Sequence, residues 1–272
     1  MNSDNFVKNG YFVKKKLFNQ KEVNKYINEI HEIFKISRER LANERQKKTY
    51  VLPDGVTKYE KFWPIIYNKS LLSIIRSLIG KNIKYTQHSD IHINLGAGQF
   101  HRDNAYRTFK TGPDWNEKKH EYKVVRVAIY LSDSKNYNSS LKILPNTHKN
   151  QTSLNTVELT IWRKLRNFWR KFFDNNFLPN FFFTTKMLSI QHDAGDCVIF
   201  DQRLVHAGGS IYNSNPKYAI FLSFGFDNQH SHNHHKFYLS RPTYLKEMPK
   251  KLKIILEKKK LLLKNSFNSL KR

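Results

Sequence analysis

Hydrophobic residues in the first third of the chain recur mainly at helical spacing. A brief apolar run over residues 10–13 indicates a strand. Asn19 suits the position that caps a helix N-terminus, because apolar residues follow it three or four positions apart, at Val23, Ile27, Ile30 and Phe34. Residues 69–80 predict a second amphipathic helix, with Gly80 as its stop.

From residue 83 onward the pattern changes to the alternation that strands show. Ile91, Ile93 and Leu95 alternate with His92 and Asn94, which is typical of a strand with one buried face. Short apolar runs between Gly, Asn and Asp turns predict further strands, over residues 124–131, 141–144, 187–191, 197–200 and 218–224. We therefore predict an all-β core, a sandwich or barrel, with flanking helices in an α+β arrangement.

Two segments depart from the strand pattern. Residues 154–186 contain the run IWRKLRNFWRKFF, in which a helix would gather its large apolar side chains on one face: Trp162, Leu165, Trp169 and Phe172. This insert suits a lid over a pocket or a helix at a membrane interface, and an ordinary insert packing on the barrel is the alternative. Residues 246–272 are lysine-rich and predict a basic C-terminal helix, with a solvated face or a frayed end.

These patterns predict one domain over residues 1–245, followed by the basic tail. Within the domain, residues 1–82 supply the first strand and the helices, and residues 83–230 supply the β core that carries the insert. A chain of 272 residues is long enough for a sandwich or barrel to bury a core.

Composition adds a strong positive charge, with 48 Lys and Arg against 22 Asp and Glu and a formal net charge of +26. Such a balance attracts nucleic acid, anionic membranes and anionic substrates. Because the lysines are scattered, compositional bias is the favoured explanation, and no specific nucleic-acid binding is expected.

Cys197, the single cysteine, is expected in the core and cannot form an internal disulfide. With no hydrophobic signal segment or membrane-length run visible, we expect a cytoplasmic protein, at most peripheral to a membrane.

One pair among the twelve histidines and their neighbours has the spacing of metal ligands. His101 and Asp103 are two positions apart, so on a strand both side chains point to the same face. Two histidines and one carboxylate on one face of an iron(II) ion leave open positions for a 2-oxo acid and dioxygen. The histidine-rich tract over residues 230–235, by contrast, is expected to be a solvated loop.

A third ligand must come from elsewhere in the chain. Residues 195–209 predict a turn, an apolar strand and then His206 before a Gly-rich bend, which a barrel would bring beside the first two ligands. Lys217 opens the next apolar strand, where its charge suits the far carboxylate of a 2-oxo acid. Arg126, the one charge on its strand, is either a buried partner for an anion or part of a salt bridge at the barrel rim.

Other polar residues are weaker candidates. Gln99 and Asn94 have the chemistry to donate hydrogen bonds to a bound oxoacid or substrate. His88 and His92 form an alternative pair, but the nearby carboxylate, Asp90, is expected on the other face of the strand.

Five segments, in order along nearly the whole chain, together resemble one known family. They are NFVKNGYFVKKKLFNQKEV, FHRDN, VVRVAIYLSD, LKILPNTHK and GDCVIFDQRLVHAGG. The sequence resembles the phytanoyl-CoA dioxygenase family of Fe(II)/2-oxoglutarate-dependent oxygenases. The resemblance implies a double-stranded β-helix, or jelly-roll, core. His101, Asp103 and His206 match the family's metal ligands. Lys217 stands where the family usually has an arginine, and lysine offers a point charge rather than a two-pronged contact.

The resemblance also implies the chemistry. Fe(II) and dioxygen would act with 2-oxoglutarate as cosubstrate, hydroxylating a small-molecule, lipid or sugar substrate and releasing succinate and CO₂. Three alternatives stay open: a basic module that binds polyanions, a catalytically silent member of the same family, and a cupin-like isomerase or epimerase that uses another metal.

Overall fold

The computed structural model of the chain describes residues 3–43, 48–95, 100–107, 109–115, 117, 121–134, 140–149, 156–172, 187–209 and 216–263. The helices are α1 (Ser3–Asn9), α2 (Gln20–Phe34), α3 (Arg38–Asn43), α4 (Gly55–Lys58), η1 (Glu60–Phe62), α5 (Trp63–Ile66), α6 (Lys69–Ile79), α7 (Thr156–Phe172), α8 (Gln229–Ser240) and α9 (Lys250–Lys258). The strands are β1 (Tyr11–Lys14), β2 (Tyr50–Pro53), β3 (Ile83–Tyr85), β4 (Asp90–Ile93), β5 (Val124–Tyr130), β6 (Leu141–Leu144), β7 (Leu188–Ile190), β8 (Cys197–Asp201), β9 (Val205–Ala207) and β10 (Tyr218–Phe226).

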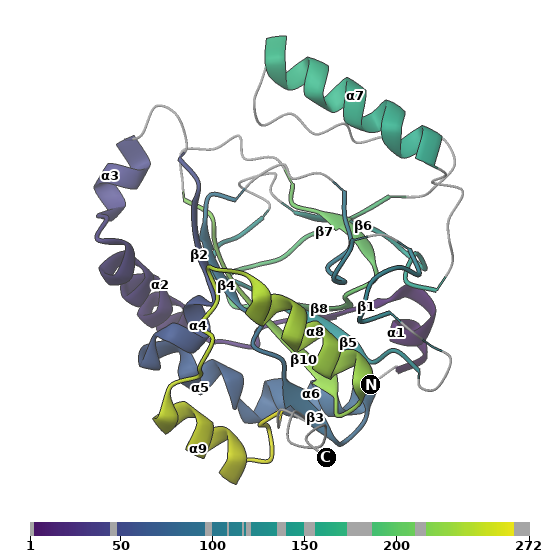
Figure 1. The fold of residues 1–272 in the computed structure, drawn as a ribbon. Helices are drawn as coiled ribbons and strands as arrows, with labels where there is room; N and C mark the ends of the chain where they lie inside the picture. Colours follow the sequence, from purple (N-terminus) through teal and green to yellow (C-terminus); the bar gives the residue numbers. More distant parts are fainter. Residues whose placement is uncertain are drawn as a thin grey trace.

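Two antiparallel sheets form the core (Figure 1). The larger has seven strands in the order β1-β8-β5-β10-β4-β2, with β3 also paired to β10, and the smaller has the order β7-β6-β9. The observed arrangement of antiparallel sheets and flanking helices confirms the predicted α+β class and the β core. Strands β2, β3 and β9 were not predicted.

Both faces of the large sheet are covered, and the central strand β5 is buried at every position. Val125, Val127 and Ile129 belong to the cluster that packs against the helices, whereas Ala128 and Tyr130 belong to the cluster shared with the small sheet. Successive side chains on a strand point to opposite faces, so a strand buried on both sides reads as an unbroken apolar run. Arg126 interrupts that run on the inner face, between the two sheets.

The N-terminal helices end where the sequence predicts. Asn19 caps α2 by accepting a hydrogen bond from the backbone of Glu22, whose side chain accepts one from Asn19 in return. The helix α6 ends at Gly80, whose φ of 108° favours a residue without a Cβ. Buried apolar residues from both helices pack on the outer face of the large sheet, which leaves the inner face for a site.

The C-terminal segment differs from the expected solvated or frayed tail. Leu252 and Leu256 of α9 are fully buried with the N-terminal helices, and Leu261 joins the same cluster. The backbone N–H of Tyr85 donates to the Leu261 carbonyl at 2.9 Å, which ties this segment to β3. Four lysines lie elsewhere along α9, so this basic segment is an amphipathic helix with a buried apolar side. Residues 264–272 lie outside the described part.

The helix predicted within the insert is present as α7, which lies beyond the small sheet at the top of Figure 1. Its described apolar side chains are 39–59% exposed: Ile161, Leu165, Phe168, Trp169 and Phe172. The remainder of the insert, residues 154–155 and 173–186, and the side chain of Trp162 lie outside the described part. The role of this segment as a lid stays a prediction. Among the helices that the structure describes, none combines the length and the apolar character needed to cross a bilayer.

Candidate metal centre

His101 and His206 lie opposite each other across one antiparallel bridge. The backbone N–H of each residue donates to the carbonyl of the other, both at 3.0 Å. His206 sits in β9, which pairs with β6 of the small sheet, while His101 comes from the loop that follows β4. The backbone N–H of Asp103 donates to the carbonyl of Gln202 at 2.7 Å, which fixes the third residue beside the same segment.

The three side chains converge on one point. One potential ligand atom from each of His101, Asp103 and His206 lies within 4.8 Å of the other two. The His101 Nε2 is 3.5 Å from one Asp103 carboxylate oxygen, and the His206 Nε2 is 3.6 Å from the other. Two imidazole nitrogens and one carboxylate on one side of a point form the donor set that non-haem iron(II) favours, so these residues fit that ion.

Hydrogen bonding prepares His206 to act as a ligand. Its Nδ1 is 2.9 Å from the Leu204 carbonyl, and since a carbonyl oxygen only accepts, the Nδ1–H must be the donor. The lone pair of the neutral ring is then on Nε2, which faces Asp103. Burial lowers the pKa of His206 to about 4, so the ring is neutral at physiological pH.

The carboxylate of Asp103 is likewise in the form that binds metal. Burial opposes its ionisation, but the two histidines and Arg126 outweigh burial and hold the pKa of Asp103 well below its usual value. The Nε of Arg126 is 3.7 Å from the Asp103 carboxylate. A neutral imidazole and an ionised carboxylate can bind a cation without first losing a proton.

A cavity of about 600 Å³ opens in front of the triad. It lies between the two sheets, and its walls include inward-facing residues of β4, β5 and β10. Apolar and aromatic side chains such as Phe100, Tyr130, Leu141 and Phe221 contribute much of the wall. A volume of this size holds a small organic molecule together with a second ligand.

Charged side chains also line this cavity. Four lining residues are cationic, namely Arg107, Arg126, Lys217 and Arg241, whereas Asp90 and Asp103 are the acidic residues among the described lining. A divalent metal would add two further positive charges. The site as a whole therefore favours anionic ligands.

Lys217 lines the cavity, as the cosubstrate role requires. Its Nζ donates to the Leu95 carbonyl at 3.3 Å, and burial lowers its pKa to about 8. Ser223 of β10 pairs with Arg126 of β5, and Lys217 lies six residues before Ser223. The backbone position of Lys217 is therefore about 20 Å along the strand from that of Arg126. The two cations therefore serve different ends of the cavity.

Arg126 is buried and paired. Its guanidinium donates to the Asp90 carboxylate and to the His88 carbonyl, and the Tyr244 hydroxyl donates to the other oxygen of Asp90 at 2.9 Å. The expected position of Asp90 on the opposite face of its strand was wrong. Positions 88, 90 and 92 share one parity, and all three residues line the cavity.

Two weaker candidates have different outcomes. Asn94 is not among the residues that line the cavity, and its side-chain oxygen accepts a hydrogen bond from the backbone of Lys217 at 2.9 Å. The structure thus gives Asn94 a part in positioning Lys217. Gln99 lies outside the described residues, so its contact with a ligand stays a prediction.

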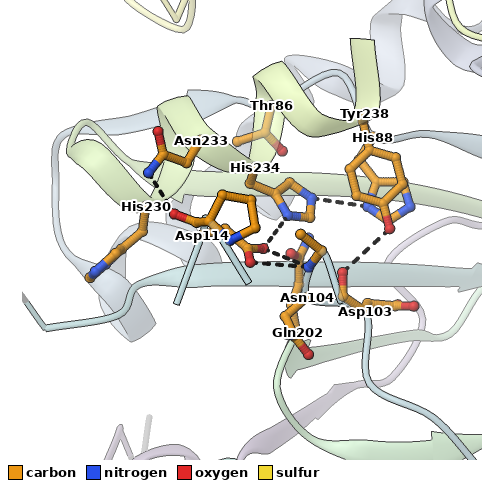
Figure 2. A network of polar contacts seen from close by, with 12 residues as sticks. Thr86, His88, Asp103, Asn104, Asp114, Gln202, His230, Asn233, His234 and Tyr238 are labelled. Carbon is orange, nitrogen blue, oxygen red and sulfur yellow. Dashed lines mark hydrogen bonds and ion pairs between the residues drawn. The ribbon is translucent and has the colours of Figure 1, made fainter. Parts of the chain in front are cut away.

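The histidine tract expected to be a solvated loop is the helix α8, and three of its histidines are buried: His230, His234 and His235. Figure 2 shows His234 between Asp114 and His88, and Tyr238 reaching the backbone of Asp103. The buried positions of α8 recur at helical spacing, but they carry polar and aromatic side chains, so the sequence shows no apolar periodicity there.

Comparisons with known proteins agree with this geometry. Residues 6–219 match the sequence profile of phytanoyl-CoA dioxygenase (PhyH). HygX from Streptomyces hygroscopicus, solved with nickel and 2-oxoglutarate bound, has a TM-score of 0.60 at 15% identity, covering 81% of this chain and 84% of HygX. The 2-oxoglutarate-dependent epimerase SnoN from nogalamycin biosynthesis has a TM-score of 0.58 at 11% identity, covering 83% of this chain and 79% of SnoN.

The carbocyclase SnoK from the same biosynthesis has a TM-score of 0.58 at 14% identity and covers 83% of each chain. No curated protein sequence matches the chain. At such low identities the solved structures establish a shared fold, whereas the family match spans most of the sequence. The chain, with its paired sheets and its His-Asp-His cluster, belongs to the phytanoyl-CoA dioxygenase family.

Proposed function

We propose that this chain is an Fe(II)/2-oxoglutarate-dependent dioxygenase that hydroxylates a small organic substrate. The observation that carries the proposal is the convergence of His101, Asp103 and His206 on the wall of a cavity of about 600 Å³. When bound there, iron would supply the activation of dioxygen. The balanced reaction consumes substrate, 2-oxoglutarate and dioxygen, and it yields hydroxylated substrate, succinate and CO₂.

The protein's own residues bind, orient and exclude water. Lys217 would pair with the distal carboxylate of 2-oxoglutarate, at an end of the cavity also lined by Leu95, Tyr130 and Ala219. Such walls keep water from weakening the ion pair. Arg126, held by Asp90, would keep the Asp103 carboxylate ionised and in place.

The substrate would occupy the part of the cavity beyond the cosubstrate. HygX has been solved with hygromycin B bound, and SnoN with nogalamycin RO, so relatives of this fold hold natural products. For this chain, Arg107 and Arg241 on the same wall support a small molecule with an anionic group. The exposed apolar face of α7, beside basic residues such as Lys164 and Lys171, supports a substrate taken from near a membrane.

Anaerobic titration of the protein with Fe(II) and 2-oxoglutarate tests the proposal. Chelation of the oxoacid by iron gives a visible charge-transfer band, which we expect in the parent protein and not in His101→Ala. His232→Ala is the matched control, because His232 pairs with Asp227 on the surface, away from the cavity. We expect this variant to keep the band.

Other outcomes would redirect the assignment. Iron binding without the band would mean that Lys217 does not hold the cosubstrate, and a different metal chemistry would move forward. No iron binding would remove the oxygenase proposal and favour the basic polyanion-binding module. A band without any 2-oxoglutarate consumption in air would favour a catalytically silent family member.

A further inference from the structure

A buried chain of side chains runs from Asp114 to the cavity. The Asp114 carboxylate accepts the backbone N–H of Ala105 with both oxygens, at 2.9 and 3.1 Å, and one of these oxygens is 2.9 Å from the His234 Nδ1. The other nitrogen of His234, Nε2, is 3.1 Å from the Nδ1 of His88 (Figure 2). His88 in turn lines the cavity. None of the metal ligands belongs to this chain of side chains.

Packing holds the His88 ring in one orientation. Its plane stacks on the ring of Tyr238, with centroids 3.5 Å apart and an angle of 21° between the planes. The Tyr238 hydroxyl donates to the backbone carbonyl of Asp103 at 3.4 Å, so the stack is fixed to the metal-binding loop. Burial lowers the pKa of His88 well below its usual value, so the ring is neutral and carries a single N–H.

The direction of the hydrogen bonds follows from the carboxylate. The Asp114 oxygen accepts, so the His234 Nδ1–H donates to it, and a His234 ring with this single proton has an acceptor at Nε2. The Nδ1 of His88 must then donate to His234. The remaining nitrogen of His88, Nε2, has a lone pair and no proton, and it lies 3.8 Å from Asp90, beyond hydrogen-bonding distance.

We propose that His88 is a substrate-binding residue, whose Nε2 lone pair accepts a hydrogen bond from a substrate hydroxyl group, and that His234 and Asp114 are positioning residues that hold it in this tautomer. The proposal rests on the proposed function only in calling the occupant of the cavity a substrate. A hydroxyl is favoured over an ammonium group, because four cationic side chains line the cavity and would repel a positive charge. His88 lies at the Arg126 end of the cavity, since its own carbonyl accepts from Arg126.

Nitrogen NMR of the full chain with ¹⁵N-labelled histidine reads the tautomers directly. The measurement uses Zn(II)-loaded protein, and it is repeated without metal. Signals are assigned from their loss in His88→Gln and His234→Gln. We expect both rings to be protonated at Nδ1 and unprotonated at Nε2. A proton on the Nε2 of His88 in the parent protein would overturn the proposal, whatever the variants do.

Asp114→Leu tests the link at a distance. The branched apolar side chain is close to aspartate in shape but offers His234 no acceptor, so nothing holds the proton of that ring at Nδ1. The single tautomer of His88 should then be lost, and a proton should appear on its Nε2 in part of the molecules. An unchanged His88 would refute the positioning role. The matched control is Asp227→Asn, which removes the carboxylate of the surface His232 pair and should leave His88 unaltered.

Glycerol serves as the hydroxyl probe and 1,2-dimethoxyethane as a probe of similar size without a donor. We expect glycerol to shift the Nε2 resonance of His88 in the parent protein, and dimethoxyethane to leave it in place. In Asp114→Leu the glycerol response should weaken. No response to glycerol, or equal responses to both probes, would contradict the assigned acceptor role. Because these readouts need neither iron nor 2-oxoglutarate, they stand or fall separately from the charge-transfer experiment.

Discussion

His101 and His206 exchange both backbone hydrogen bonds although they are far apart in the sequence, so two metal ligands are placed by main-chain geometry alone. Each peptide group is satisfied by the other, and neither bond involves an imidazole. The backbone therefore places these two ligands before any ion binds, and metal binding would not have to bring the segments that carry them together.

This relationship predicts that His101→Ala removes metal binding while leaving the fold intact. The substitution keeps the backbone bridge and deletes a partly exposed ring, so the free energy of unfolding of the metal-free protein should change by less than about 1 kcal/mol. Ni(II) should raise the Tm of the parent protein, since an ion that binds the native state stabilises it, but should not raise that of the variant. A large loss of stability without metal would contradict the independence of the bridge.

Arg126→Met should destabilise the protein strongly, because it leaves the buried Asp90 carboxylate without its cation. We expect a loss of about 3–5 kcal/mol in urea unfolding. Asp90→Asn combined with Arg126→Met should recover part of that loss. Lys61→Met is the control, since Lys61 pairs with Glu29 and Glu32 while about half exposed, and solvent-exposed ion pairs add little to stability. Equal effects of the two single substitutions would argue against a buried ion pair.

Cosubstrate affinity should fall as the pH rises through 8. The pKa of Lys217 is about 8 in the free protein, and a bound carboxylate would raise it, so binding requires uptake of a proton above pH 8. The Kd of 2-oxoglutarate should be nearly flat below pH 7 and increase by up to about tenfold per unit above 8. Calorimetry with Ni(II)-loaded protein measures this dependence.

Lys217→Met should weaken binding and abolish the rise in Kd with pH, whereas Lys251→Met, at an exposed ion pair with Glu60, should preserve it. Lys217→Arg keeps its positive charge at all accessible pH values, so this variant should bind 2-oxoglutarate with a Kd that does not increase above pH 8. A Kd that depends on pH in the same way in all three variants would assign the proton to another group.

The C-terminal helix should be part of the cooperative fold. Leu256→Ala opens a void in a fully buried position and should cost about 2–5 kcal/mol, while Ile254→Ala, on the 52% exposed side of the same helix, should cost under about 1 kcal/mol. Urea unfolding followed by circular dichroism separates the two values. Similar small losses in the free energy of unfolding for both variants would show that this segment is a frayed tail, as its composition suggests.

The sequence predicts best those features that depend on local spacing. The cap at Asn19, the stop at Gly80 and the apolar run of β5 around Arg126 each leave a periodic or chemical mark within a few residues. The spacing of His101 and Asp103 is visible for the same reason, since side chains two positions apart share a face in an extended segment, although the structure places the pair in the loop after β4 and not on a strand.

Features set by register between distant segments were harder to foresee. The bridge that places His206 depends on how β9 meets the loop after β4, and no local pattern encodes that meeting. The chain from Asp114 to His88 joins two loops and a helix, so its members look like unrelated polar residues in the sequence. Leu252 and Leu256 were masked by the lysines around them.

The pairing of β6 with both β7 and β9 has a bearing on how such a protein can diversify. The long excursion that contains α7 leaves the small sheet after β6 and returns at β7, and these two strands lie side by side. The residues that close this excursion are thus tied together by their own ladder, independently of what lies between them. Lengthening, shortening or exchanging the excursion would leave the neighbouring strand that holds His206 in register. On the prediction that this excursion helps to select the substrate, exchanging it at this junction would change the preferred substrate while the reactive centre is inherited unchanged.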